Sequence, residues 1–88
     1  MFDIKKIPSV EMKGANWAII RINGVGTFLQ SYSTIIAAKT PDGVFLDRDK
    51  WDYSATTNKH RCDFLDEYIA ETRKKIKSGE YTLIDLNP

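Results

Sequence analysis

The residues best suited to chemistry are His60 and Cys62, each the only one of its kind in the chain. A cysteine beside a histidine can act as a nucleophile with its base. On a helix, however, residues two positions apart point in different directions. Metal cages that need two or more histidines are also excluded. We therefore expect His60 to lie at the surface or in a helix cap, and Cys62 to pack as a small apolar residue.

Three aspartates cluster in the segment LDRDKWDYS, where Asp47, Asp49 and Asp52 offer oxygen ligands of the kind that calcium prefers. The segment lacks the central glycine and the closing glutamate of an EF-hand loop. Arg48 and Lys50 offset two of the three charges, so we expect a solvated turn. The chain offers no convincing nucleophile with a base, metal set or pair of catalytic carboxylates. It predicts a protein that is not an enzyme and has no catalytic residue, bound metal or cofactor.

The segment 51–60 is the strongest candidate for binding, because WDYSATTNKH places two aromatic residues before hydroxylated and cationic side chains. One interpretation is a helix entry, in which hydroxyls cap the helix and the aromatic residues fasten the loop to the core. The other is an exposed loop that binds an anionic group at the positive end of a helix. Capping explains the hydroxyls but requires no cations. The candidate binding residues in this segment are Tyr53, Thr56, Thr57, Lys59 and His60.

A second candidate set is the basic run at 73–77, from which we single out Arg73, Lys74 and Lys77. These side chains either contact phosphates or complement the negative C-terminus of a helix. Lys59, Arg73 and Lys77 are separated by 14 and 4 residues. Both spacings are close to whole helical turns, so one positive stripe along a single helix is possible. Acidic residues between them dilute that stripe.

The elements that must position these residues begin with a sheet. Residues 15–47 predict an antiparallel meander of three or four strands, with a type I′ hairpin at Asn23-Gly24 and a bulge or close backbone approach at Gly26. Residues 81–86 predict a last strand or a packed arm. A further arm or edge strand, broken at Pro8, is indicated by Phe2, Ile4, Ile7 and Val10.

The helix is predicted from Thr57 to Ser78, because this stretch has no proline and its apolar residues recur at helical spacing. A hydroxyl of Ser54, Thr56 or Thr57 can cap its start, and Gly79 is a natural stop. The residues expected to face the sheet include Leu65, Tyr68, Ile69 and Ile76. We expect an α+β fold: an antiparallel β-sheet of three to five strands with one long helix packed on one face.

Length and composition describe one ordinary globular domain, spanning residues 1–88. The net charge of +1 gives no overall field toward nucleic acid or an anionic membrane. No apolar run approaches the length of a membrane span. A single cysteine fits a reducing compartment, and the charged N-terminal segment does not resemble a signal peptide. We therefore expect no membrane partner and a cytoplasmic location.

The stretch 31–65 resembles a small uncharacterised domain found in bacteriophage and prophage proteins. The specific part of the resemblance is a Tyr-Ser-x-Thr-Thr-Ser-Lys-His box that leads into a helix with Phe-Leu, and Asn58 stands where that pattern has serine. The resemblance implies a phage or mobile-element origin and no enzymatic activity, and it assigns no catalytic residue. The matching residues are Ser31, Tyr32, Thr34, Ile36, Ala37, Tyr53, Ser54, Thr56, Thr57, Lys59, His60, Phe64 and Leu65.

Three functions are compatible with these observations. The first is a phage-type accessory protein that works in the host cytoplasm, where it binds and inhibits a host protein such as a restriction or CRISPR-type defence component. The second is a small nucleic-acid-binding module that uses the helix face from Lys59 to Lys77 together with the box. The third is an assembly protein that forms homodimers or larger oligomers through a free sheet edge. We expect the first.

Overall fold

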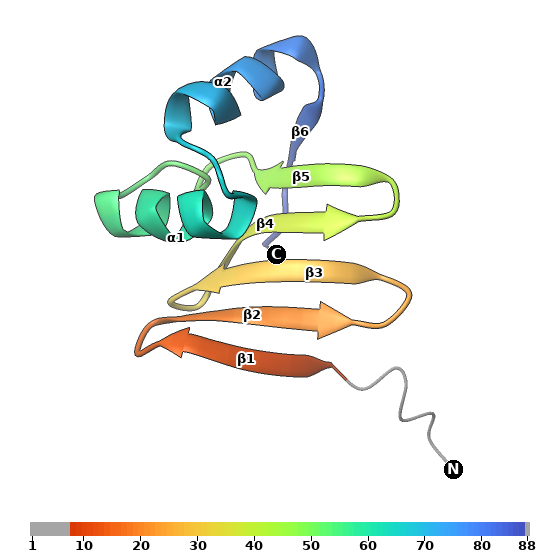
Figure 1. Ribbon diagram of the computed structural model, residues 1–88, viewed down its shortest axis with the longest axis vertical. Coiled ribbons are helices and arrows are strands. Elements are labelled where there is room, and N and C mark those ends of the chain that lie inside the picture. The colour runs from red at the N-terminus through yellow and green to blue at the C-terminus, as the bar shows by residue number, and fades with distance from the viewer. Residues whose placement is uncertain (1–7, 88) are drawn as a thin grey trace.

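The computed structural model describes residues 8–87, which form a six-stranded sheet and two helices. The strands lie in the sheet in chain order, and neighbours are antiparallel except β5 and β6, which are parallel because the helices intervene between them. Figure 1 shows the helices beside the β4–β6 half of the sheet. The elements are β1 (Ser9–Gly14), β2 (Trp17–Ile22), β3 (Gly26–Ser31), β4 (Thr34–Thr40), β5 (Gly43–Asp47), α1 (Ala55–Leu65), α2 (Ile69–Ser78) and β6 (Tyr81–Ile84).

The predicted fold class is wrong in its details, although the fold is α+β. The sheet has six strands rather than three to five, it is mixed rather than antiparallel, and two short helices replace the single long one. The meander predicted for residues 15–47 is present as the four strands β2–β5. The additional strands come from the two segments that the sequence left open as strands or arms. Phe2, Ile4 and Ile7 lie outside the described residues.

The long helix is interrupted at Asp66, which adopts a left-handed conformation with φ 55° and ψ 47° and ends α1. Aspartate tolerates this conformation better than most residues, so no glycine marks the break. The chain then turns through Glu67 and Tyr68, and α2 begins in a new direction. As a result α1 packs on β3 and β4, whereas α2 packs against β6. Tyr68 is 84% exposed, so the prediction that it faces the sheet is wrong.

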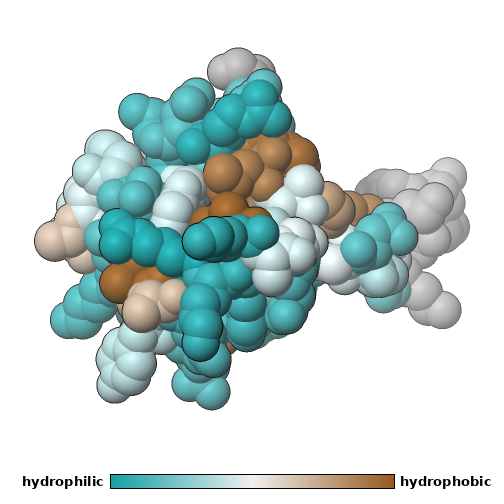
Figure 2. Space-filling view, turned by 90° about the horizontal axis from the view of Figure 1, so that it is seen from above, coloured by the Kyte–Doolittle hydropathy of each residue, from teal (hydrophilic) through white to brown (hydrophobic). Residues whose placement is uncertain are grey.

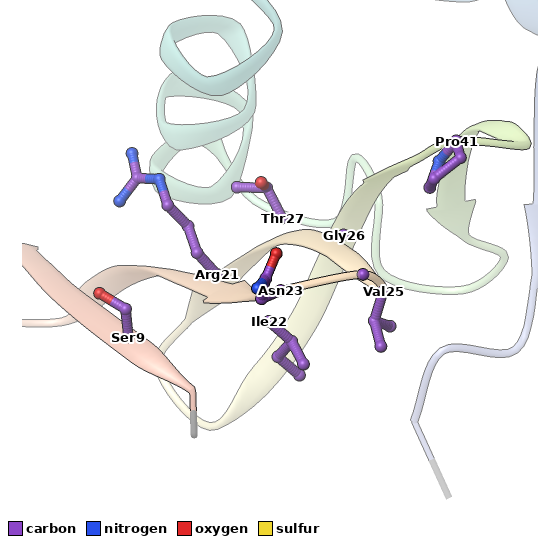
Figure 3. A pocket seen from close by; sticks show the side chains of 9 residues that line it. Ser9, Arg21, Ile22, Asn23, Val25, Gly26, Thr27 and Pro41 are labelled. Atoms are coloured by element: carbon purple, nitrogen blue, oxygen red, sulfur yellow. The ribbon is translucent and has the colours of Figure 1, made fainter. Parts of the chain in front are cut away.

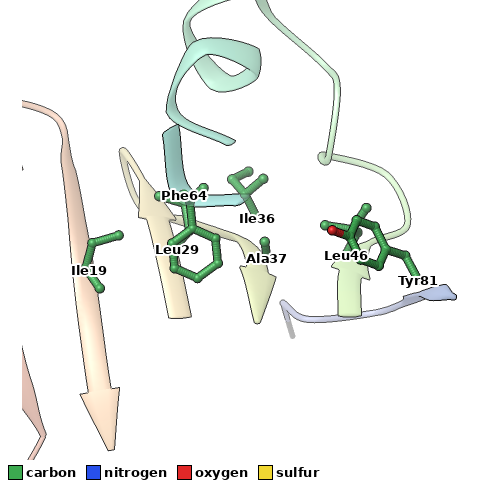
Figure 4. Close-up of a cluster of buried hydrophobic side chains, with 7 residues drawn as sticks. All are labelled: Ile19, Leu29, Ile36, Ala37, Leu46, Phe64 and Tyr81. Carbon is green, nitrogen blue, oxygen red and sulfur yellow. The ribbon is translucent and has the colours of Figure 1, made fainter. Parts of the chain in front are cut away.

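The core lies between α1 and one face of the sheet. Figure 4 shows Phe64 of α1 against side chains that rise from the strands. Leu29, Ile36 and Leu46 in the centre of the sheet are fully buried. Burial of these side chains is the main source of stability in a domain of this size. The buried apolar cluster consists of Ile19, Leu29, Ile36, Ala37, Leu46, Phe64 and Tyr81.

Two backbone features predicted for the meander, the turn at Asn23-Gly24 and the close approach at Gly26, can be compared with the structure. Asn23 has no positive φ, so the hairpin is not type I′; only Gly24 is left-handed there, with φ 83°. Gly26 makes the predicted close approach, because a Cβ atom at this position would meet the backbone oxygen of Lys39 at 2.5 Å. A side chain is therefore excluded at Gly26, and β3 can pass close to β4.

The turn after β5 is built around a buried carboxylate rather than a solvated one. Asp47 is 5% exposed and accepts hydrogen bonds from the amides of Lys50 and Leu86, both at 2.9 Å. The hydrogen bond to Leu86 holds the segment after β6 across β5 (Figure 1). Farther along, the side chain of Asn87 accepts a hydrogen bond from the amide of Ile35 in β4 and donates one to the carbonyl oxygen of the same residue. The solvated turn predicted for the three aspartates is wrong at Asp47, whose carboxylate ties the C-terminal segment to the sheet.

Neither helix within residues 8–87 is long and apolar enough to cross a membrane. Seen from above, the α2 end of the molecule is mainly hydrophilic, with a central apolar patch and smaller apolar patches around it (Figure 2).

Candidate protein-binding surface

The segment 53–60 forms the entry to α1. Ser54 is the N-cap, and its side chain accepts a hydrogen bond from the amide of Thr57 at 3.1 Å. Helical periodicity then turns Thr57 and His60 toward the sheet, where both are buried, while Thr56 and Lys59 face solvent. The candidate binding residues of this segment therefore divide into a buried pair and an exposed set that also includes Tyr53.

His60 anchors α1 to the sheet. Its Nδ1 lies 3.1 Å from the hydroxyl of Ser31, and its ring stacks on Trp17 with centroids 4.4 Å apart and planes 10° apart. Burial lowers the pKa of His60, an effect that Lys59 reinforces and Asp63 opposes. The imidazole is therefore a neutral packing group at pH 7, not an exposed cation.

Thr56 and Lys59 line a hollow of about 570 Å³ beside α1, which Tyr53 does not reach. Lys59 and Asp63 stand one helical turn apart on its wall, so its charges are balanced, and Thr56 adds a hydroxyl. The hollow offers polar contacts but no concentration of one charge.

The basic residues at 73–77 lie on α2, where Arg73, Lys74 and Lys77 are exposed. The break at Asp66 places them on a different helix from Lys59. The single positive stripe that the sequence suggested is therefore absent from the described residues.

Lys75 belongs to an interior network instead. It lies 2.7 Å from the carboxylate of Glu67, whose other oxygen accepts a hydrogen bond from Thr72 at 3.0 Å. Burial alone would raise the pKa of Glu67, but hydrogen bonds with Lys75, Tyr81 and Thr72 hold it below its ordinary value. The same carboxylate raises the pKa of Lys75. This network joins the turn between the helices to α2 and β6.

Arg61 is a structural residue that sequence reasoning underestimated. Its whole side chain is buried. Its guanidinium donates to the backbone oxygen of Trp51 at 2.8 Å and to Asn58 Oδ1 at 2.6 Å, and it lies over the Trp51 ring. Arg61 thereby holds the loop before α1 in place. Because arginine side chains are rarely buried, nothing in the sequence pattern marks Arg61 as a buried residue.

Within residues 8–87, no three His, Cys, Asp or Glu side chains are grouped closely enough to hold a metal ion. A hollow of about 520 Å³ at the β2–β3 hairpin also lacks a convergent polar set. In Figure 3 the side chains of Arg21 and Thr27 point to one side of the sheet, whereas those of Ile22 and Val25 point to the other.

The most distinctive surface is the sheet face turned away from the helices, where β1, β2 and the end of β3 meet. Register pairs Val10 with Ile20 and Met12 with Ala18, so these side chains share one face, opposite the core residue Ile19. Val10 is 58% exposed and Met12 63%. We call the surface formed by Val10, Met12, Ile20 and Tyr32 the apolar face.

The apolar face surrounds a hollow of about 500 Å³ whose lining contains no Lys, Arg, Asp or Glu. At its rim Tyr32 is 51% exposed and adopts φ 57°, a left-handed conformation that is uncommon for a residue other than glycine. Sequence reasoning missed this surface. The alternation of Val10, Glu11, Met12 and Lys13 was the available signal for a strand with one apolar face.

Comparison with known proteins shows that residues 5–80 match the model of a family of unknown function (DUF8033). No curated protein and no solved structure matches the chain. The matched range takes in β1–β5, both helices and the box at 53–60. The chain belongs to this family of unknown function.

Proposed function

We propose that the chain is a non-enzymatic accessory protein of phage type that binds a host protein and inhibits it, and that the apolar face is its contact surface. The observation that carries the proposal is the grouping of exposed Val10, Met12 and Tyr32 on a sheet face that no helix covers within residues 8–87. Contiguous exposed apolar side chains of this kind mark interaction sites.

The chemistry of the apolar face favours a protein over a nucleic acid. Nucleic-acid binding depends on cations that neutralise phosphates, and the lining of the hollow contains no charged residue. Aromatic residues and methionine are enriched at the centres of protein interfaces, where charged residues are depleted. Tyr32 and Met12 provide such side chains.

The conformation of Tyr32 supports a binding role. A left-handed backbone costs a residue with a Cβ atom about 1 kcal/mol or more, and glycine or asparagine would be the favourable choice in this turn. Tyr32 is 51% exposed, so about half of its surface is free for an aromatic contact with a partner.

The burial of the Ser31–His60 pair favours inhibition that blocks a surface of the partner over inhibition by catalysis. The hydroxyl of Ser31 lies beside His60, but Ser31 is 2% exposed, so a substrate has no access to this pair. Binding that blocks a surface of the partner requires no reacting group. The resemblance of residues 31–65 to phage domains supports a partner in the bacterial host.

The test is affinity capture from a bacterial lysate treated with nuclease, using the full chain and two matched variants. Tyr32→Asp places a charge at the rim of the apolar face, whereas Tyr68→Asp makes the same change at an exposed tyrosine elsewhere. We expect a captured protein whose activity falls on binding, retained by Tyr68→Asp and lost by Tyr32→Asp. Capture that nuclease abolishes, or that Tyr32→Asp leaves unchanged, would contradict the proposal.

A further inference from the structure

We infer that a hollow between α1 and the sheet binds a nucleotide, with its terminal phosphate between Arg21 and Lys39 and its base beside Trp17. This hollow lies on the helix side of the sheet, opposite the apolar face. The inference therefore goes beyond the proposed function and does not depend on it.

The hollow opens where α1 leaves its side of the sheet uncovered. The helix packs on β3 and β4, and beside it a hollow of about 390 Å³ extends over β2 and β3. Figure 3 shows Arg21 of β2 and Thr27 of β3 on the same side of the sheet as α1. The buried residues Ile19 and Phe64 supply part of the apolar lining. The volume is in the range of small-molecule sites, which span about 300–1,000 Å³.

Strand register places two cations on either side of a hydroxyl. Arg21 pairs with Thr27, and Thr27 pairs with Lys39, so the three residues form one row across β2, β3 and β4. The register shift in the β3–β4 ladder lies beyond Leu29 and does not reach this row. Since adjacent strands are about 4.8 Å apart, the Cα atoms of Arg21 and Lys39 are separated by about 10 Å. Both long side chains can therefore reach an anionic group held over Thr27.

Contacts within the chain hold both cations beside the hollow. Nη1 of Arg21 donates a hydrogen bond to Glu11 at 2.9 Å, which leaves other N–H groups of the guanidinium for a ligand. Nζ of Lys39 donates to the backbone oxygen of Phe64 and lies 4.4 Å from the centre of the Phe64 ring. An ammonium group has three donors. Lys39 can therefore keep this contact and bind an anion as well.

The charges around the hollow favour an anion. Its lining contains the three cations Lys13, Arg21 and Lys39 and one carboxylate, that of Asp63. Glu11 forms ion pairs with Lys13 and Arg21, so cations still outnumber carboxylates when it is included. A phosphate monoester carries about two negative charges at neutral pH and has three acceptor oxygens. It can therefore accept hydrogen bonds from all three members of the row, which a carboxylate with two oxygens matches less well.

Trp17 indicates that the phosphate belongs to a ligand with a flat ring. His60 stacks on the indole of Trp17, but the hollow is lined by Trp17 and not by His60. Part of the indole is thus available to a ligand, and nucleic-acid bases stack on aromatic side chains. Trp17 precedes Arg21 by four residues in β2, a distance of about 13 Å along the strand. A ligand that contacts both must join its phosphate to its ring through a spacer, as the ribose of a nucleotide does.

A titration of the ¹⁵N-labelled full chain with AMP, from about 10 μM to about 10 mM, tests this inference, since the range brackets weak ligands. The chain has two tryptophans, and Trp51 does not line the hollow, so its indole N–H signal is an internal control. We expect the indole signal of Trp17 to shift and that of Trp51 to stay in place. Inorganic phosphate and adenosine each carry only part of the AMP chemistry, and we expect each to bind at least about tenfold more weakly.

Three variants test the role of the cations. Arg21→Gln and Lys39→Gln each remove one charged donor from the row, and we expect each to weaken AMP binding about tenfold or more. Lys74→Gln removes an exposed cation from α2 and should bind AMP like the unaltered chain. Thermal melting followed by circular dichroism checks that each variant keeps the fold.

A shift at Trp17 that the two row variants weaken and Lys74→Gln does not would support the site. A 5′-phosphorylated dinucleotide then separates the two sources of this chemistry: affinity equal to that of AMP would support the end of a strand, and weaker binding a free nucleotide. A Trp17 signal that AMP leaves unchanged throughout the range would overturn the inference. So would equal losses in Arg21→Gln and Lys74→Gln, or inorganic phosphate that binds as tightly as AMP, because the row or the ring would then make no specific contact.

Discussion

Replacement of Asp47 by alanine should destabilise the protein more than its position at the end of a strand suggests. The carboxylate is buried, and it accepts hydrogen bonds from the amides of Asp49 at 3.3 Å, Lys50 at 2.9 Å and Leu86 at 2.9 Å. These bonds close the turn after β5 and fasten the segment that follows β6. Asp47→Ala would leave all three amides without this acceptor.

The magnitude follows from the three bonds. A hydrogen bond to a charged group contributes about 1.5–3 kcal/mol, but the bond at 3.3 Å is weak and the turn amides can bind water instead. We therefore expect a loss of about 3 kcal/mol in the free energy of unfolding. In a domain of this size that loss lowers the Tm by about 12–24 °C.

Urea denaturation of Asp47→Ala and of Asp49→Ala provides the assay, with the slope of the transition compared to exclude changes in the unfolded state. Asp49 comes from the same sequence run but is exposed, so its replacement should change stability by less than about 0.5 kcal/mol. If the two variants lose the same stability, the carboxylate of Asp47 does not hold the C-terminal segment as described.

Three further predictions concern the helices. Phe64→Ala should cost about 3–5 kcal/mol in a urea titration, and Leu65→Ala clearly less, because Leu65 is only half-buried; the reverse order would contradict the helix orientation. Because burial lowers the pKa of His60, the folded state resists protonation, so stability should fall as the pH drops below about 6.5; in His60→Gln this loss should disappear from melting curves. The lowered pKa of Glu67 should give a loss of stability below about pH 4.5. Glu67→Gln should be less stable at pH 7, and in acid titrations followed by circular dichroism it should not show this loss of stability below about pH 4.5. An acid transition that is the same in Glu67→Gln and the unaltered chain would contradict the role of Glu67.

The strands of the meander could be predicted because local signals mark both their interiors and their turns. Turn residues separate β4 from β5, and Gly24 separates β2 from β3. The break in the helix left no such signal. Asp66 ends α1 in a conformation that glycine usually provides, and the spacing of Leu65, Tyr68 and Ile69 continued the helical pattern across it. The helix is broken because α1 packs on β3 and β4 whereas α2 packs against β6, and these contacts exist only in the folded sheet.

The candidate site shows the same division between local and long-range information. The cap at Ser54 is local and was among the predicted ones. The burial of His60 depends on Ser31 and Trp17, which are distant in the sequence and meet it only in the folded sheet. The buried side of α1 is formed largely by polar and charged residues, so hydropathy could not identify it. The apolar face likewise needs the pairing of β1 with β2 before its residues come together.

The most direct test of the proposed contact surface is site-specific photocrosslinking to the captured partner. A photoreactive phenylalanine analogue replaces Tyr32 at the rim of the apolar face in one variant and Tyr68 at the start of α2 in another. Both tyrosines are exposed, at 51% and 84%, so neither replacement should disturb the core. We expect crosslinks to the partner from position 32 and none from position 68. Crosslinks from position 68 alone would contradict the assignment and place the interface on the helices.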